Sequence, residues 1–324
     1  FIVLAYEAVN ILFYRQNEQK DTRISVYGFI IVISCFLQAM FGVVQFFGFF
    51  QISTTLWVTG SFDNPAGFAA CLCAGFPFVG FLLSDSNKYI RYVGGLIGFV
   101  IVIAVILSQS RAGIMSIAFI CFILLNMKFF HKRWVKYLSL LCFALLLSGC
   151  YWMKKDSADG RLLIWRCSVS MVKDAPWLGH GIGSFEARYM DYQADYFRQY
   201  GLNRYSMLAD NVKHPFNEYL GVLLNFGFVG LLMILALITL LIYCYKKHPC
   251  AEKRIAFYSL ISIGVFSFFS YTFTYPFTWI VTFLCIIILT KEYIAKVFTC
   301  PIIKNTVCTV SYTHLRAHET RSNL

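Results

Sequence analysis

The chain has 324 residues, of which 59% are hydrophobic and 14% are charged. Water-soluble domains carry about a quarter charged residues, so this composition excludes such a domain and indicates helices embedded in a lipid bilayer. The formal net charge is +12 at pH 7. Lys and Arg lie mainly in short loops, which indicates membrane topology and no nucleic-acid partner.

Residues 1–14 resemble the end of a membrane span, and the chain begins at Phe1 with no initiator Met and no signal-peptide pattern. We therefore expect a fragment whose first helices are missing. Apolar runs long enough to cross a hydrocarbon core of about 30 Å then recur along the sequence. They predict spans at 24–50, 66–84, 92–108, 112–128, 134–152, 218–245, 255–273 and 277–297.

Basic residues distinguish the two sides of the membrane. The short loops that carry several Lys or Arg residues are 15–23, 85–91, 128–136 and 246–254. The connections that carry one at most are 51–65, 109–112 and 274–276. Short loops rich in Lys and Arg are cytoplasmic, whereas long loops are translocated largely regardless of charge. The long segment 154–217 therefore faces outward.

The polar segment 154–217 divides the chain into domains. We expect an all-α fold, namely a polytopic membrane helical bundle with one large extracytoplasmic loop of short helices. The membrane helices occupy residues 1–153, truncated at the N-terminus, and 218–298. Residues 308–324 depart abruptly from the preceding composition and resemble translated sequencing-adapter read-through. We expect this tail, with its histidines, to be a non-native artefact.

Two short helices are expected inside the outer segment. The first runs over residues 161–173, with Asp159 as its N-cap. The second runs from Ser184, its cap, to Tyr200 and ends at Gly201. Apolar residues at three- and four-residue spacing give the first helix a face that can rest on the membrane or on the bundle.

The second helix carries tyrosines at 189, 192, 196 and 200. Placement at the level of the lipid headgroups is the default interpretation, and a platform that stacks on sugars is the alternative. Between the two helices, Gly179, Gly181 and Gly183 alternate. They predict a tight turn, although alternating glycines also allow backbone N–H groups to approach a phosphate.

Four polar residues on the outer side offer chemistry. Arg111 is the basic residue in the turn between two spans, and Arg161 opens the outer segment. Such arginines either snorkel to lipid phosphates or bind a phosphate ligand in a bidentate manner. His180 and His214 are the outer histidines. His214 lies where the chain re-enters the membrane and can act as a general base near neutral pH; a surface histidine bonded to a headgroup is the alternative.

No D-x-D, H-E-x-x-H or C-x-x-C motif occurs in the sequence. A metal-dependent transferase that uses nucleotide sugars would need a chelating acidic pair. We therefore expect neither a metal nor another cofactor, and we expect arginines to bind a diphosphate directly.

Five short motifs follow one another between residues 55 and 245. They are Gly60-Ser-Phe-Asp-Asn64-Pro65, Ser110-Arg111-Ala-Gly113, Arg161 with Trp165, Gly179-His-Gly181-Ile-Gly183-Ser-Phe185 and His214-Pro-Phe-Asn217-Glu-Tyr-Leu220. Together with the spans and the loop orientation, this order resembles the O-antigen ligase and O-antigen polymerase superfamily of bacterial envelope enzymes.

The resemblance implies a metal-independent glycosyltransferase in the bacterial inner membrane, with its large loop on the outer face. Its donor would be a glycan on undecaprenyl diphosphate, and its acceptor a hydroxyl of lipid A–core, another glycan or a protein. Arg111 and Arg161 would hold the diphosphate, and His214 would activate the acceptor. The further residues that the resemblance places at the substrate are Ser110, Asn217, Gly181, Gly183 and His180.

The chain departs from the family pattern at the proposed base. The family usually has His immediately before Asn, and Phe216 stands there, with His214 two residues earlier. His180, Glu218 and Asp210 therefore remain alternative bases. A ligase and a polymerase share this layout. A lipid-linked glycan transporter is the rival from another class. Transporters carry paired broken spans or ionisable residues deep in spans; here no paired broken spans are evident, and Glu7 is the only clearly internal charge. A non-catalytic component of envelope assembly is a third alternative.

Overall fold

The computed structural model describes residues 19–49, 58–129, 133–153 and 155–299. Residues 1–14 and the tail 308–324, the subjects of two sequence predictions, lie outside the described residues. The longer helices are α2 (Gln19–Phe46), α3 (Pro65–Gly75), α5 (Lys88–Leu107), α6 (Arg111–Phe129), α7 (Arg133–Met153), α8 (Lys155–Asp174), α9 (Ser184–Tyr200), α10 (Glu218–Lys247), α11 (Ala251–Phe269) and α12 (Pro276–Thr299). The short ones are η1 (Phe76–Phe78), α4 (Val79–Leu83), η2 (Ser206–Leu208) and η3 (Thr272–Thr274).

Five segments of the described residues are long and apolar enough to cross a membrane. They are Val26–Phe46, Pro65–Leu83, Lys88–Leu107, Glu218–Lys247 and Pro276–Tyr293. The remaining predicted spans coincide with helices α6, α7 and α11, of which α6 contributes a shorter apolar run, Arg111–Met127. No strand is present among the described residues. The predicted all-α, polytopic membrane fold is thereby confirmed.

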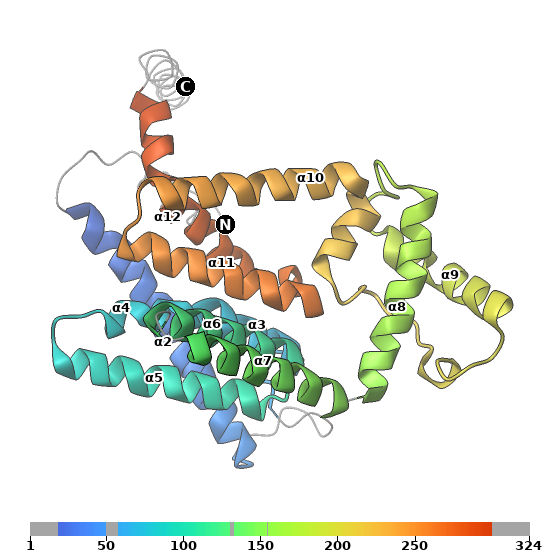
Figure 1. Cartoon of the computed structure of the whole chain (residues 1–324), viewed down its shortest axis with the longest axis horizontal. Helices are drawn as coiled ribbons and strands as arrows, with labels where there is room; N and C mark the ends of the chain where they lie inside the picture. Colours follow the sequence, from blue (N-terminus) through green and yellow to red (C-terminus); the bar gives the residue numbers. More distant parts are fainter. Residues whose placement is uncertain (1–18, 50–57, 130–132, 154, 300–324) are drawn as a thin grey trace, which may run out of the picture.

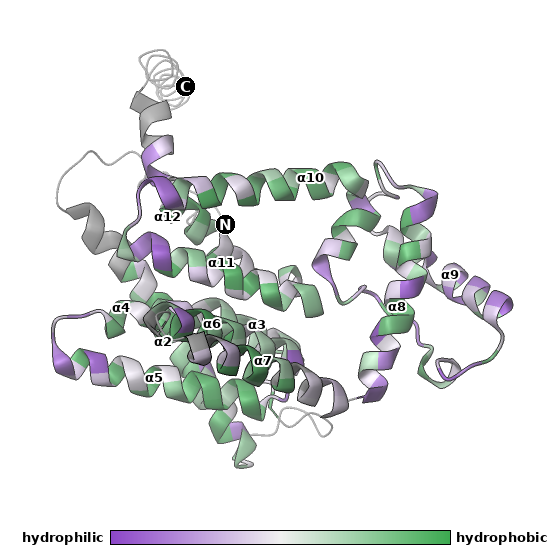
Figure 2. Ribbon diagram, viewed as in Figure 1, coloured by the Kyte–Doolittle hydropathy of each residue, from purple (hydrophilic) through white to green (hydrophobic). Residues whose placement is uncertain are grey.

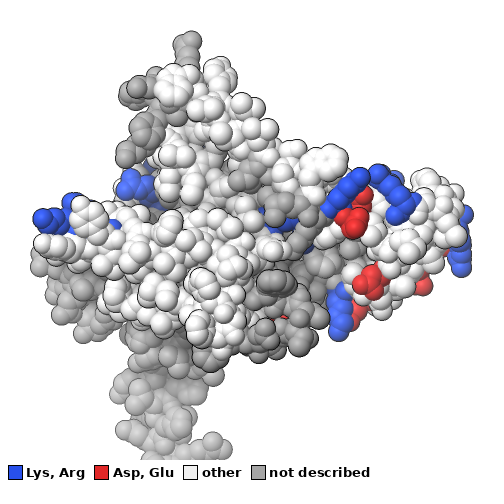
Figure 3. All heavy atoms as spheres, turned by 90° about the horizontal axis from the view of Figure 1, so that it is seen from below, with Lys and Arg blue, Asp and Glu red and all other residues white. Residues whose placement is uncertain are grey.

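The polar helices α8 and α9 project from one end of the apolar bundle (Figure 1). The α4–α5 and α10–α11 connections lie at the opposite end, where hydrophilic residues gather again (Figure 2). On the face that Figure 3 shows, charged side chains gather at the two ends, and few lie on the surface between them. This arrangement separates the two basic loops from the α8–α9 unit, as the distribution of Lys and Arg predicts.

Helix α11 lies at the centre of the bundle and packs against α3, α6 and α12. Buried hydroxyl groups bond helix to helix there. Ser259 Oγ donates to the Ala74 carbonyl and Ser262 Oγ to the Cys73 carbonyl, each at 2.7 Å. Ser116 Oγ of α6 lies 2.8 Å from Ser262 Oγ. Small polar side chains of this kind let membrane helices approach closely while their hydroxyls are satisfied.

Helix α8 begins at Lys155, earlier than the predicted residue 161. The predicted N-cap Asp159 is wrong, because Asp159 lies inside the helix and its buried carboxylate accepts a hydrogen bond from Tyr151 Oη at 3.3 Å. Acidic residues suit the first turns of a helix whether or not they cap it. Helix α9 has the predicted bounds, with Gly183 as its N-cap in place of Ser184.

The tyrosines of α9 do not share one environment. Tyr189 is buried and stacks on Phe185, with ring centroids 4.9 Å apart. Tyr192 Oη donates to Asp174 Oδ2 at 2.5 Å, while Tyr200 is exposed. The stripe therefore supplies part of the small core between α8 and α9 and is not uniformly interfacial.

Helix α10 is broken at Gly227, which the predicted continuous span 218–245 did not foresee. Gly227 has φ +61° and ψ −159°, a conformation that is essentially restricted to glycine. The freed backbone groups pair with the loop after α8. Phe228 N donates to the Pro176 carbonyl at 2.8 Å, and His180 N donates to the Leu224 carbonyl at 2.7 Å. The break is thus closed by the glycine-rich loop.

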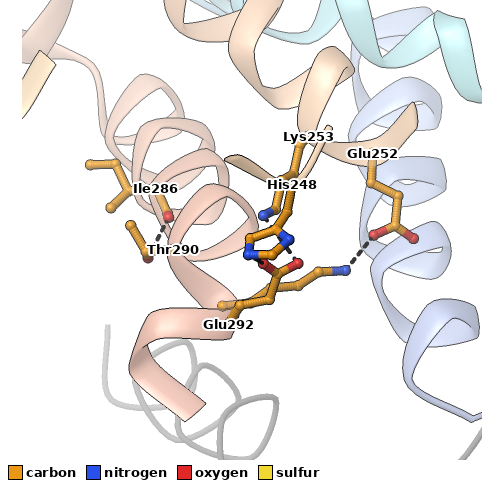
Figure 4. A network of polar contacts seen from close by, with 7 residues as sticks. His248, Glu252, Lys253, Ile286, Thr290 and Glu292 are labelled. Atoms are coloured by element: carbon orange, nitrogen blue, oxygen red, sulfur yellow. Dashed lines mark hydrogen bonds and ion pairs between the residues drawn. The ribbon is translucent and has the colours of Figure 1, made fainter. Parts of the chain in front are cut away.

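Ion pairs join three helices at the end opposite to α8 and α9 (Figure 4). The fully buried Lys253 Nζ lies 3.1 Å from Glu292 Oε1, and His248 Nε2 lies 3.5 Å from Glu292 Oε2. Lys291 Nζ lies 2.9 Å from Glu252 Oε2. These contacts tie the end of α10 and the start of α11 to α12.

Candidate active site

The turn between α11 and α12, residues 270–275, is the centre of the candidate site. Hydroxyl groups hold it in place: Ser267 Oγ donates to Thr272 Oγ1 at 2.9 Å, and Thr278 Oγ1 donates to the Thr272 carbonyl at 2.6 Å. The turn lies at the end of the bundle that carries α8 and α9 (Figure 1). Side chains from four separate segments converge on it.

Tyr271 of this turn connects the first and last of the sequence motifs. Its ring stacks on the His214 ring, with centroids 4.9 Å apart and planes inclined by 24°. Its hydroxyl accepts a hydrogen bond from Asn64 Nδ2 at 3.3 Å. Asn64 Oδ1 also caps α3 by accepting from Gly67 N at 2.8 Å, and it accepts from Tyr275 Oη at 3.0 Å.

Arg161 of α8 reaches the same turn. Its Nη1 donates to the Phe269 carbonyl at 2.6 Å, and its guanidinium carbon lies 5.1 Å from the centroid of the Phe216 ring. The Phe216 ring in turn lies 5.3 Å from the Tyr271 ring. Burial lowers the pKa of Arg161 to about 10, and the positive charge of Arg111 is the second cause. Arg161 therefore stays charged at neutral pH with another guanidinium nearby.

Arg111 is the first residue of α6, and its Nη2 donates to Ser157 Oγ of α8 at 2.8 Å. The preceding Ser110 is buried, and its Oγ accepts from Gly113 N at 3.4 Å. Ser110 thus shapes the start of α6. The S-R-x-G motif therefore directs its arginine toward α8, which carries Arg161.

His214 is half-buried at the point where the chain returns to the membrane. Desolvation lowers its pKa below the ordinary value, and Lys213 adds to this effect while Glu186 opposes it. None of the hydrogen bonds within the described part of the chain engages its ring. Trp165 Nε1 fixes the adjacent backbone by donating to the Pro215 carbonyl at 3.0 Å.

The next residues anchor the start of α10. Phe216 has φ +51°, which is uncommon for a residue other than glycine. Asn217 Oδ1 caps the helix by accepting from Leu220 N at 3.1 Å. Glu218 Oε1 accepts from Phe273 N at 2.8 Å, so this carboxylate holds the α11–α12 turn.

His180 has both ring nitrogens engaged. Nε2 lies 2.7 Å from the Met171 carbonyl and Nδ1 lies 2.9 Å from Arg188 Nη1. These partners require a proton on Nε2 and an acceptor at Nδ1. The imidazole consequently has no nitrogen left to accept a proton from a substrate.

The glycine-rich motif lies against α10. His180 N and Gly181 N donate to the carbonyls of Leu224 and Asn225, at 2.7 Å and 3.1 Å. Gly183 provides the left-handed N-cap of α9, with φ +81°. This motif therefore builds the break in α10, and two of its backbone N–H groups already have partners.

Asp210, the remaining alternative base, is exposed. Its Oδ1 accepts from Asn211 N at 2.8 Å. Among the described residues, no three His, Cys, Asp or Glu side chains gather closely enough to hold a metal ion.

An apolar cavity of about 670 Å³ lies between α6, α7, α10 and α11. Its walls include Met115, Phe143, Leu241 and Leu260. Phe269 also lines it, and the carbonyl of Phe269 is the one that accepts from Arg161. The cavity therefore adjoins the arginine from the membrane side.

The sequence patterns missed the contribution of Tyr271, Tyr275 and the whole α11–α12 turn. The apparent signal was weak, since the connection at 274–276 carries no basic residue. The run Tyr271-Thr-Phe-Thr-Tyr275-Pro276 is nevertheless rich in hydroxyl groups for a short turn between two apolar helices. Aromatic rings with hydroxyl groups in a turn between two membrane helices were the sequence feature that could have indicated this part of the site.

Comparison with protein families gives a match over residues 96–235, to the family described as O-antigen ligase. A search of curated proteins finds no match. The matched range contains Arg111, Arg161 and His214, together with the α8–α9 unit. Enzymes of this superfamily are membrane glycosyltransferases of the ligase or polymerase type, and they act on lipid-linked glycans and glycan acceptors. The apolar helices indicate a multi-pass membrane protein, and residues 96–235 of the chain match the O-antigen ligase family.

Proposed function

We propose that the protein transfers a glycan from an undecaprenyl-diphosphate donor to a hydroxyl group of an acceptor. The observation that carries the proposal is that Arg161 and His214 meet at the α11–α12 turn, with Arg111 close enough to act on the charge of Arg161. Arg161 lies close enough to Arg111 for their charges to interact, and its side chain contacts Phe216. Phe216 and His214 both contact the Tyr271 ring.

The arginines supply what a diphosphate leaving group needs. Planar, permanently charged guanidinium groups bind phosphate oxygens in a bidentate manner. Within the described residues, Arg161 forms no ion pair with a carboxylate, so its charge is available to a ligand. The setting at the membrane boundary has a lower dielectric constant than water, which strengthens such contacts.

The apolar cavity fits the lipid part of the donor. It offers about 670 Å³ lined by aliphatic and aromatic side chains, within the range of ligand pockets. Because Phe269 joins the cavity to Arg161, an isoprenoid chain in the cavity would place its diphosphate beside the guanidinium groups. The donor would thus be held at both its apolar and its anionic parts.

His214 is the proposed general base. Its neutral imidazole accepts the proton of the acceptor hydroxyl while the hydroxyl oxygen attacks the anomeric carbon of the donor sugar. The bond from that carbon to the diphosphate oxygen breaks, and the leaving diphosphate retains the electron pair. Arg111 and Arg161 stabilise the negative charge that develops, and the guanidinium groups serve as the cations of this step.

We place the α8–α9 unit on the outer face of the bacterial inner membrane. The basic loops at the opposite end support this orientation. Residues 154–217 would then form the outer domain between two groups of membrane helices, 19–153 and 218–298. The acceptor would be lipid A–core, a growing glycan or a protein. The identity of the acceptor distinguishes a ligase from a polymerase.

The break in α10 does not favour a transporter. Transporters use broken helices whose free backbone groups line a substrate cavity. Here the backbone groups at Gly227 are paired with the loop after α8. No second candidate function is therefore advanced.

The test is a glycan-transfer assay in membranes with Arg111→Ala, Arg161→Ala and His214→Ala. Removal of one charge-stabilising donor lowers turnover by about 10²–10³-fold, and removal of a base lowers it by about 10²–10⁴-fold. Arg198→Ala is the matched control, because Arg198 is exposed and its ion pair among the described residues is with Asp195 on its own helix. Full activity in both arginine variants, with normal expression, contradicts the diphosphate site.

Unchanged turnover in His214→Ala would move the base to another group and leave the diphosphate site in place. The donor-binding affinity separates the two roles. It should fall in the arginine variants and stay near the original value in His214→Ala.

A further inference from the structure

The loop between α8 and α9, residues 175–183, displays large apolar side chains to its surroundings. Trp177 is 70% exposed, Leu178 is 75% exposed and Ile182 is 84% exposed. They stand next to one another on a short loop of a mostly polar segment. Apolar side chains grouped in this way on one short loop indicate a surface that meets an apolar partner.

This loop is fixed in a conformation that keeps those side chains outside. Four backbone hydrogen bonds of 2.7–3.2 Å join it to the break in α10 and involve residues 176, 177, 180 and 181 of the loop. A Cβ atom on Gly179 would lie 2.6 Å from Phe226 N, so the two backbones are in direct contact. The loop therefore cannot turn to bury its side chains without losing the backbone hydrogen bonds that it forms with the break in α10.

The exposed loop surface continues onto a membrane span. The Trp177 ring packs edge-on against the Phe228 ring of α10, with centroids 6.1 Å apart. Phe228 is 42% exposed, and the exposed apolar surface proceeds along the same span through Leu232 and Met233. Because α10 is long and apolar enough to cross a membrane, this side of it faces acyl chains.

Trp177 occupies the position at which tryptophan is enriched in membrane proteins. An indole ring at the end of a span places its apolar body in the lipid and its N–H near the headgroups. Exposed Lys173 and Arg188 lie near the loop, at the end of α8 and on α9. Such cations suit the level of the lipid phosphates.

We propose that the 175–183 loop inserts Trp177, Leu178 and Ile182 into the adjacent leaflet of the bilayer and anchors the α8–α9 unit to the membrane surface. The partner is the lipid bilayer itself. In this interpretation the glycine-rich motif and the break at Gly227 hold the membrane-anchoring loop in a fixed conformation. The anchor holds α8, and with it Arg161, at the depth of lipid headgroups.

The experiment uses the full chain in nanodiscs of phosphatidylcholine, with and without bromine atoms on the acyl chains. The emission of Trp177 is obtained as the difference between the original protein and Trp177→Phe, which keeps an aromatic ring against Phe228. Bromine on the acyl chains should quench most of this emission, and aqueous iodide should quench little of it. Ile182→Trp in the Trp177→Phe background should behave in the same way.

Leu202→Trp in the same background is the matched control. Leu202 is 88% exposed but belongs to the connection after α9, at the far end of the α8–α9 unit (Figure 1). Its added indole should be quenched by iodide and not by brominated lipid. The proposal is overturned if iodide quenches positions 177 and 182 while brominated lipid does not.

It is also overturned if neither agent quenches them, because a second protein copy would then cover the loop. These readouts do not depend on glycan transfer. The anchor and the proposed enzymatic function can therefore fail separately.

Discussion

The imidazole ring of His214 stacks on the phenol ring of Tyr271, with centroids 4.9 Å apart and planes inclined by 24°. The two residues are far apart in sequence: His214 precedes α10, and Tyr271 follows α11. The stack orients an imidazole whose nitrogens form no hydrogen bond among the described residues. Tyr271 is thus placed as a positioning residue for the proposed base.

Removing the ring should weaken that positioning. In Tyr271→Ala the platform is lost, and we expect kcat to fall by about threefold to tenfold, in line with the ~0.5–1.5 kcal/mol of an aromatic pair. Tyr271→Phe keeps the ring and loses only the hydroxyl that accepts from Asn64, so it should retain most activity. Steady-state kinetics decide between them. Equal losses in both variants would show that the Asn64 bond, and not the stack, is what matters.

The arginines should not tolerate lysine. Arg161 contacts the Phe269 carbonyl and the Phe216 ring at once, which uses both the planar shape and the charge of the guanidinium. Arg161→Lys keeps the charge but loses the fork, so we expect a loss of transfer that approaches the loss in Arg161→Ala. The measurement is the transfer rate at saturating donor. A fully active lysine variant would mean that charge alone suffices.

The transfer rate should depend on pH through His214. Its pKa is lowered, chiefly by burial, which favours the neutral imidazole and moves its protonation to a lower pH than is usual for histidine. Because a base acts in its neutral form, the rate should be flat around neutrality and decline toward acid. A profile of kcat/KM against pH in sealed membranes measures this decline.

Two charged neighbours of His214 allow its role in the pH dependence to be tested, because they shift its pKa in opposite directions. Glu186 raises the pKa of His214, so Glu186→Gln should move the acidic decline to lower pH. Lys213 lowers it, so Lys213→Gln should move the decline to higher pH. Opposite displacements identify His214 as the titrating group. Displacements in the same direction would assign the decline to another residue.

The predictability of the fold differs between its parts. The membrane spans follow from the lengths of apolar runs, which is a local property, and the family match over residues 96–235 confirms the resemblance drawn from short motifs. Asp159 failed as a cap because its burial beside Tyr151 depends on how α7 meets α8. The break at Gly227 could not be predicted from the sequence for a similar reason. Its backbone is satisfied by residues 176–181, and a single glycine in an apolar run carries no sign of that partner.

The site was predicted in part. Arg111, Arg161 and His214 were named from residue chemistry and motif order; Arg161 and His214 lie at the α11–α12 turn, and Arg111 bonds to α8, the helix that carries Arg161. Their roles stay predictions. The contacts of Tyr271 to Asn64, His214 and Phe216 could not be found from sequence, because they require three segments to meet in space. Ser110 and Asn217 were expected at the substrate, and the structure gives both side chains helix-capping bonds.

Gly227 and Gly179 should be intolerant of alanine. Gly227 combines φ +61° with a position where a Cβ atom would overlap the Trp177 carbonyl oxygen. Such a conformation costs on the order of 1–3 kcal/mol for other residues, before the steric conflict is added. Gly227→Ala should therefore lower Tm in detergent clearly. Gly95→Ala in α5 is the matched control, because no described atom beyond its own helix backbone and its chain neighbours lies within 4 Å of its added Cβ, and alanine favours helix by about 1 kcal/mol.

The ion pairs at the end opposite to α8 and α9 should stabilise the bundle unequally. Lys253 is fully buried, so Glu292→Gln leaves its charge without its nearest carboxylate (Figure 4). Breaking a buried pair costs about 3–5 kcal/mol, and we expect the lower end because Glu292 is partly exposed. Asp195→Asn breaks the exposed pair with Arg198 and should change stability by at most about 1 kcal/mol.

Lys253→Met combined with Glu292→Gln separates the buried charge from the pairing itself. If the loss in Glu292→Gln comes from an uncompensated ammonium group, removing that group as well should restore most of the thermal stability. If the double variant is as unstable as the single one, the carboxylate of Glu292 acts through another contact. His248, 3.5 Å from the same carboxylate, is then the group to replace next, since it joins the end of α10 to α12.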